Sequence, residues 1–283
     1  MRKIWASLAF VLIAATLAFP QKVSFQLTGG FVWVNGDDYN KGVAGENRHL
    51  QDMAISLSGA YKELSGGLKF AVEVMNYLSP NFVIGLGGAY FRTSTVSRVT
   101  SRESLGDTSI DIESTYTARV SVIPFFLNLH YLARLGPHWK LDVFVGPAFD
   151  IVQFNFENPI LTPALSTSET ETFTASITTL GLQGGLGLNY DISPAISLVL
   201  NGFYRYGKVS NIMGNWADSV TTPAGTTIKS NAEYYIWAYN DGSYPQIGFY
   251  DSNGPGGASV SGARKADINI SGLTLLAGVK FSI

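Results

Sequence analysis

The stretch that decides the fold is LTLLAGVKFSI, residues 273–283. Every odd-numbered position in it is apolar, whereas Thr274, Gly278, Lys280 and Ser282 stand at even-numbered positions. Strict alternation indicates a β-strand with one apolar and one polar face, because successive side chains point to opposite sides of a strand. The segment therefore predicts a strand that separates an apolar from a polar environment.

The same alternation recurs along the chain, for example in the apolar row from Phe82 to Tyr90 and in the row from Ile196 to Tyr206. Long strands with period two favour an all-β protein. We predict eight main strands, at about 23–34, 66–78, 82–97, 115–133, 138–153, 172–190, 195–208 and 266–283.

Composition excludes several protein classes. Only 14% of the 283 residues are charged, against about 25% in a typical soluble domain. Beyond the first twenty residues no apolar run approaches the roughly 18 residues of a transmembrane helix. A formal net charge of −2 gives no basic surface for nucleic acid, and the absence of cysteine excludes disulfides and zinc–thiolate sites.

The N-terminus resembles a secretory signal. Met1-Arg2-Lys3 is a short basic start, and the apolar stretch 4–18 is too short to span a bilayer but has the length of a signal core. We expect cleavage after Ala18, which leaves residues 19–283 as one exported domain. Without cysteine, that domain cannot be anchored as an acylated lipoprotein.

The spacing of the strands predicts the architecture. Short connections at 79–81, 135–137 and 191–194 alternate with long ones at 35–65, 98–114, 154–171 and 209–265. Short turns on one end and long loops on the other are typical of outer-membrane barrels. Aromatic residues near both ends of the apolar rows would form two outward girdles, with Tyr116 in the girdle on the long-loop side. We therefore predict a closed antiparallel up-and-down transmembrane β-barrel with eight strands. Ten remain possible, because 53–61 also alternates weakly.

Parity predicts which polar residues line the barrel interior. We expect a lumenal polar network in which Glu73 or Asp142 pairs with Arg119 or Arg205. A bulge near Pro124-Phe125 would change the phase of its strand, placing Ala118, Val120 and Val122 outside. Since eight strands enclose space only for side chains, we expect a packed lumen or at most a narrow pore. The predicted network comprises Glu73, Arg119, His130, Asp142, Arg205 and Lys280.

The fourth long connection is rich in aromatic residues around Asn240-Asp241-Gly242-Ser243, which suggests a hairpin turn. Exposed Tyr and Trp could stack on a glycan or anchor a protein partner. Alternatively, strands extend beyond the membrane there and the rings pack on one another. The aromatic residues concerned are Trp216, Tyr234, Tyr235, Trp237 and Tyr239.

The chain resembles the small bacterial outer-membrane β-barrel superfamily of OmpX-like and OmpA-like proteins. The resemblance rests on the signal segment, on the stretches 122–131, 143–149 and 181–190, and on the alternating C-terminal strand. It implies location in the bacterial outer membrane, contact with outer-membrane lipid, and recognition of the last strand by the barrel assembly machinery. In that family the last residue is usually aromatic, whereas here Phe281 is third from the end.

No sequence motif predicts catalysis, a cofactor or a metal site. The single strand histidine, His130, could form a Ser-His-acid set with Ser121 and Glu73, but nothing in their spacing supports one. We therefore expect a non-enzymatic protein with a structural or surface-interaction role. The alternatives are a lipid-modifying hydrolase in the outer membrane and a soluble ligand-binding barrel resembling lipocalins, whose apolar face would point inward.

Overall fold

The computed structural model describes residues 22–105 and 108–283, so the predicted export signal lies outside the described residues. The described chain is mostly β-sheet, and each pair of neighbouring strands runs antiparallel. This confirms the prediction of an all-β antiparallel fold. No helix in the described ranges is long and apolar enough to cross a membrane.

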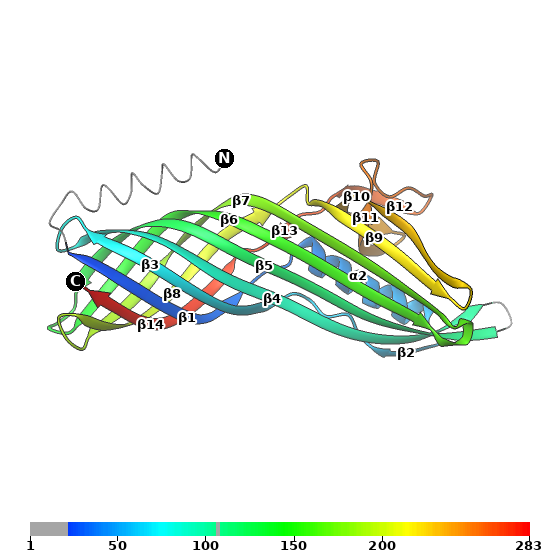
Figure 1. Cartoon of the computed structure of the whole chain (residues 1–283), viewed down its shortest axis with the longest axis horizontal. Helices are drawn as coiled ribbons and strands as arrows, with labels where there is room; N and C mark the ends of the chain where they lie inside the picture. Colours follow the sequence, from blue (N-terminus) through cyan, green and yellow to red (C-terminus); the bar gives the residue numbers. More distant parts are fainter. Residues whose placement is uncertain (1–21, 106–107) are drawn as a thin grey trace.

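Eight strands pair edge to edge in a closed ring, in which β14 joins β1 on one side and β8 on the other. The short turns between ring strands lie at one end of the molecule, together with the C-terminal residue (Figure 1). We call this end the proximal end and the opposite end the distal end. The ring strands are β1 (Val23–Trp33), β3 (Gly66–Tyr77), β4 (Phe82–Leu105), β5 (Thr108–Arg134), β6 (Trp139–Thr162), β7 (Thr167–Asp191), β8 (Ile196–Val209) and β14 (Gly272–Ser282).

Strands β4 to β7 are 24 to 27 residues long and continue well beyond the ring (Figure 1). The segments 98–114 and 154–171, expected as long loops, are therefore mostly the ends of two hairpins. The segment 209–265, expected as a loop, also contains strands. The additional elements are β2 (Ser56–Gly59), a short 3-10 turn at Pro163–Leu165, β9 (Met213–Thr222), β10 (Gly225–Asp241), β11 (Tyr244–Tyr250), β12 (Val260–Lys265) and β13 (Ile268–Asn269).

The environment of both faces changes along each long strand, as β6 shows. In its proximal half the outward Val145 is 51% exposed, whereas the inward Asp142 is buried. In its distal half the outward Gln153 is exposed and polar, whereas the inward Phe154 is buried in an apolar cluster. The proximal half of the molecule thus has an apolar outside and a polar inside, and the distal half has the reverse.

Strand β5 corrects one prediction from parity. The register between β4 and β5 is unchanged from Gly88 opposite Phe125 to Phe91 opposite Val122, so no bulge changes the phase near Pro124. Even-numbered residues face inward along the whole strand, including the buried Ala118, Val120 and Val122, which were expected outside. They belong inside because the interior of the distal half is apolar.

A helix, α2 (Asp38–Met53), occupies part of the segment 35–65 that was expected as a loop. Two asparagines one heptad apart attach it to the backbone just before β3. The Asn40 amide both donates to Leu64 O and accepts from Leu64 N, each at 2.9 Å. The Asn47 amide does the same with the backbone of Tyr61, at 2.8 and 2.7 Å. These paired bonds fix the rotation of the helix about its axis.

A second face of α2 lies directly on β11. A Cβ added to Gly45 would stand 1.7 Å from the carbonyl oxygen of Pro245, and one added to Gly42 would stand 2.7 Å from Cγ2 of Ile247. The first turn of the helix is fixed separately, since Asp38 accepts hydrogen bonds from Arg264 Nη2 at 2.6 Å and from Asp267 N at 2.8 Å. Helix α2 is thereby a fixed part of the distal half.

Replacing Gly45 by Ala should loosen α2. The added methyl meets a backbone carbonyl, and overpacking of this kind costs about 1–3 kcal/mol, which outweighs the roughly 1 kcal/mol that Ala gains over Gly in a helix. In hydrogen exchange, the backbone amides of α2 should exchange at least about fivefold faster. The backbone amides of the ring strands should exchange at an unchanged rate. Gly136→Ala, where a Cβ meets nothing within 4 Å, is the control. Equal protection of α2 in both variants would contradict this packing.

Candidate functional site

The lumen of the proximal half contains a buried network centred on His130. Its ring lies between two carboxylates, with Nε2 3.0 Å from Glu73 Oε1 and Nδ1 3.0 Å from Asp142 Oδ1. Asn128 Nδ2 also donates to Glu73 Oε1 at 2.9 Å, and Gln183 Nε2 donates to Asn128 Oδ1 at 3.0 Å. These side chains come from four strands, so the network links β3, β5, β6 and β7 across the lumen.

A second group of buried charges lies nearer the distal half. Arg205 forms an ion pair with Asp150, and both side chains are almost fully buried. The Lys69 ammonium lies 4.5 Å from the ring centroid of Phe203. A cavity of about 20 Å³, lined by Lys69 and Phe203 and by Glu73 of the first network, has room for one water molecule. The lumen is therefore filled by side chains at this level.

The structure places the predicted network residues as follows. Glu73, His130 and Asp142 lie together, and Arg205 and Lys280 are also buried inside the ring. Arg119 instead lies on the outward face of β5, in the distal half, because odd-numbered residues of that strand point outward. The expected pairing of Arg205 with Glu73 or Asp142 is replaced by its pairing with Asp150.

The possible Ser-His-acid set is not assembled. Ser121 is on the outward face of β5, where it accepts a hydrogen bond from the Tyr90 hydroxyl at 3.4 Å, whereas His130 points inward. Both ring nitrogens of His130 are engaged by carboxylates. A lumenal glycine leaves room for this contact, since a Cβ on Gly85 would stand 2.1 Å from Glu73 Oε1.

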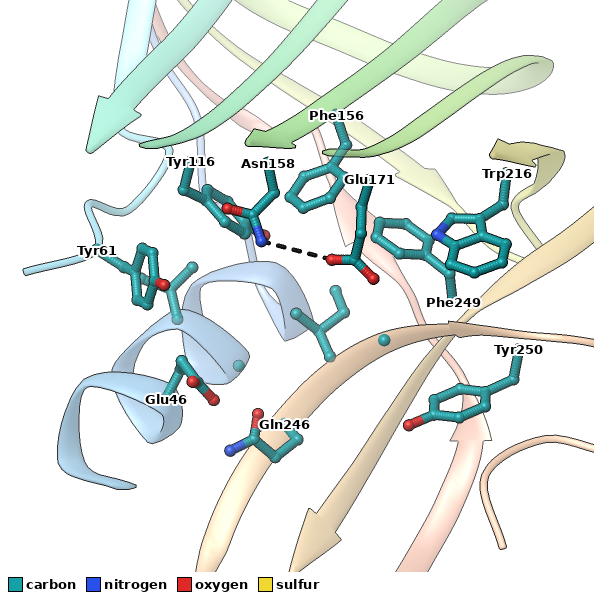
Figure 2. Close-up of a pocket in the computed structure, with 14 residues that line it drawn as sticks. Glu46, Tyr61, Tyr116, Phe156, Asn158, Glu171, Trp216, Gln246, Phe249 and Tyr250 are labelled. Carbon is teal, nitrogen blue, oxygen red and sulfur yellow. Dashed lines mark hydrogen bonds between the residues drawn. The ribbon is translucent and has the colours of Figure 1, made fainter. Parts of the chain in front are cut away.

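The distal half contains a cavity of about 360 Å³. Its wall is formed by α2, by the segment before β3, by the distal parts of β5, β6 and β7, and by β9 and β11. We call it the cup pocket. The side chains labelled in Figure 2 line it: Glu46, Tyr61, Tyr116, Phe156, Asn158, Glu171, Trp216, Gln246, Phe249 and Tyr250.

A chain of hydrogen bonds crosses the wall of the cup pocket. The Tyr61 hydroxyl donates to Ser114 Oγ at 3.2 Å, and Ser114 Oγ donates to Asn158 Oδ1 at 2.7 Å. The amide of Asn158 then donates from Nδ2 to Glu171 Oε2 at 3.4 Å (Figure 2). Because each donor orients the next acceptor, the chain fixes the direction of the Glu171 carboxylate.

Aromatic rings form most of the remaining wall and pack on one another. The ring centroid of Tyr116 lies 5.1 Å from that of Tyr61 and 4.5 Å from that of Phe156. The ring centroids of Phe156 and Phe249 are 4.9 Å apart. Burial raises the pKa of Tyr61, and the nearby charges of Glu46 and Glu171 raise it further. Burial likewise raises the pKa of Tyr116 well above its ordinary value. Both hydroxyls therefore stay neutral at physiological pH.

The aromatic residues singled out in the segment 209–265 pack mainly within β9–β12. Trp216 lies 4.9 Å from Tyr234, and it is the member of the set that lines the cup pocket. The Lys265 ammonium lies 3.5 Å from the ring centroid of Tyr235. Trp237 Nε1 donates to Asp251 O at 3.1 Å, and the hydroxyls of Tyr239 and Tyr250 are 3.2 Å apart. The rings are half-buried, as the packing interpretation requires.

Sequence reasoning missed the other parts of the cup pocket. Glu46 and Glu171 stood in segments expected as loops, and Tyr116 was assigned to an outward girdle although it faces inward. The alternation of Phe154, Phe156 and Asn158 beyond the expected end of its strand was the available signal. Within the described ranges no group of three His, Asp or Glu side chains could hold a metal ion.

No protein-family model matches the chain, and no curated relative matches it. Several solved structures are similar to it at low identity. They include a major outer membrane protein from Thermus thermophilus (14% identity, TM-score 0.39, 94% of this chain and 100% of that chain), the outer membrane protease OmpT from Escherichia coli (13%, 0.36, 95% and 100%), and Ail, the attachment invasion locus protein of Yersinia pestis (12%, 0.31, 93% and 100%).

Replacing His130 by Leu should destabilise the protein strongly. The substitution leaves Glu73 and Asp142 buried without their shared partner, which costs about 3–5 kcal/mol. The free energy of unfolding, measured by denaturant titration of the folded protein in detergent, reports the loss. His138→Leu, in an exposed proximal turn, should cost less than about 1 kcal/mol.

The same measurement on a triple variant separates charge from packing. Adding Glu73→Gln and Asp142→Asn to His130→Leu removes both unpaired charges, so most of the lost stability should return. A triple variant as unstable as His130→Leu alone would show that the three side chains do not act as a charge network.

Proposed function

We propose that this protein is an integral β-barrel of the bacterial outer membrane with a closed lumen and a structural or surface-interaction role that involves no catalysis. The observation that carries the proposal is the reversal of polarity along the long strands β4 to β7. An apolar outside around a polar inside suits lipid surroundings, and a polar outside around an apolar core suits water. The ring would cross the membrane, and the distal half would project from the cell.

The size of the apolar surface fits a bilayer. Outward apolar rows run from Phe82 to Tyr90 on β4 and from Ile196 to Tyr206 on β8, which is nine and eleven positions counted inclusively. A tilted transmembrane strand needs about 9–11 residues. We call the outward apolar rows in the proximal half of the ring strands, taken together, the apolar belt.

Aromatic residues lie outward at both edges of the apolar belt, where amphipathic rings meet lipid headgroups. At the proximal edge Phe82, Tyr131 and Trp139 are 43–47% exposed. At the distal edge Trp33, Tyr90 and Tyr206 are 44–55% exposed. On β4 the next outward residue after Tyr90 is the exposed Arg92, which would lie in the aqueous or headgroup region.

This arrangement favours a membrane barrel over a soluble ligand-binding barrel. A soluble barrel would need its apolar face inward, whereas the proximal ring has Glu73, His130 and Asp142 inside. The buried ion pairs and the small lumenal cavity support a lumen without a continuous channel. We further propose that outer-membrane lipid surrounds the apolar belt and that the assembly machinery recognises β14, where Phe281 faces outward.

Cell fractionation and gel mobility test the proposal. The protein should be recovered with outer membranes, be extracted only with detergent, and migrate differently before and after boiling. In planar bilayers the folded protein should produce no stable conductance steps. Recovery in the soluble periplasmic fraction would contradict the membrane assignment, and reproducible ion conductance would contradict the closed lumen.

An outward charge should be costly only within the apolar belt. Leu186 and Ser176 are outward residues of the same strand, β7. Leu186 lies within the apolar belt, and Ser176 lies beyond its distal edge. Arginine near the bilayer midplane costs about 2–4 kcal/mol and near the interface about 0–1 kcal/mol. Leu186→Arg should therefore lose about 2–4 kcal/mol of unfolding free energy in lipid vesicles and Ser176→Arg at most about 1. Equal losses of unfolding free energy in the two variants would contradict the proposal that lipid surrounds the apolar belt.

A further inference from the structure

The charge of the cup pocket distinguishes it from the lumen. Two carboxylates face the cavity from opposite sides, Glu46 from α2 and Glu171 from β7 (Figure 2). None of the described lining residues is Lys, Arg or His. No hydrogen bond or ion pair joins Glu46 to another described residue. Because the Glu46 carboxylate faces the cavity without such a partner, the cup pocket favours a cation near it.

The aromatic wall restricts what kind of cation fits. Six of the lining residues are aromatic: Tyr61, Tyr116, Phe156, Trp216, Phe249 and Tyr250. The faces of aromatic rings attract ammonium groups, and the attraction increases when water is excluded. A small hydrated metal ion would gain little from such a wall and would find too few oxygen ligands. An organic cation gains from both the rings and the Glu46 carboxylate.

The wall is also preorganised. The Tyr61–Ser114–Asn158 chain holds Glu171, and the paired bonds of Asn47 hold the helix from which Glu46 projects. Fixed groups bind more tightly because less conformational freedom is lost on binding. A volume of about 360 Å³ lies within the range of small-molecule sites.

We propose that the cup pocket binds a small organic ammonium ion, with its charged group against the Glu46 carboxylate and its methyl or methylene groups against the aromatic wall. The proposal rests on the proposed function for its setting, since the distal half must project into water for a soluble ligand to reach it. A neutral sugar is the competing occupant, because it could stack on Trp216 and bond to Gln246 without using either charge.

Calorimetric titration of the full chain, folded in detergent at low salt, tests the proposal with two probes of equal shape. Choline carries a quaternary ammonium, and 3,3-dimethylbutan-1-ol replaces its nitrogen by carbon. Choline should bind at one site at least tenfold more tightly than the alcohol. Equal affinities, or no saturable binding of choline, would overturn the proposal.

Two variants place the binding in the cup pocket. Glu46→Gln keeps the shape of the side chain and removes its charge, and Trp216→Leu removes one ring; each should weaken choline binding at least fivefold. Glu157→Gln is the matched control, because Glu157 is exposed on the outward face of β6 between Phe156 and Asn158. Unchanged affinity in Glu46→Gln would overturn the proposal.

Methyl β-glucoside provides the last arm. Saturable binding of this neutral sugar that Glu46→Gln leaves unchanged, without binding of choline, would assign the cup pocket to sugars and overturn the cation proposal. Heat-dependent gel mobility of each sample reports separately whether the barrel is folded. If the unsubstituted chain forms a normally folded barrel but does not bind choline, only the cation proposal is contradicted. A soluble protein without heat-dependent gel mobility contradicts the proposed function.

Discussion

The reversal of polarity along the long strands is the constraint on which the rest of the structure depends. Outward Leu and Val side chains in the proximal half leave the inward positions to polar residues, and buried charges there must be paired. His130 between Glu73 and Asp142, and Arg205 against Asp150, are paired in this way. The buried ammonium groups of Lys69 and Lys280 have no hydrogen-bond partner among the described residues. In the distal half the same strands place Val120, Phe154 and their neighbours inside, so this half needs its own apolar core.

That core explains why α2 and the strands β9–β12 exist. The distal ends of β4 to β7 form a wall whose inner face is apolar, and an uncovered apolar face would be exposed to water. Helix α2 contributes Tyr39 and Val43 to the core, and β10 contributes Ile236. The helix approaches β11 closely enough to need glycine at two positions, and the cup pocket is the space left between these layers. Stability of the distal half and formation of the pocket are thus linked.

Period-two alternation predicts the strands well because each ring strand has one face toward each environment. Arg119 was misplaced because parity alone does not say where along a strand the environments exchange, so a charge was assumed to point inward everywhere. Helix α2 was missed because Tyr39 and Val43 are the large apolar residues among its buried ones, and the remaining buried positions are Asp38, Gly42 and Gly45. The cup pocket was missed because it joins side chains from seven segments distant in sequence, and pairing such as that of Arg205 with Asp150 is likewise nonlocal.

Collision accessibility of nitroxide labels along one strand tests the central claim most directly. The chain has no cysteine, so single cysteines at outward positions of β6 from Leu141 to Glu157 can be labelled individually in the protein reconstituted in vesicles. Labels from 141 to 151 should be accessible to oxygen and protected from a water-soluble nickel complex, and labels from 153 onward should show the reverse. Accessibility to the nickel complex along the whole strand would contradict the account.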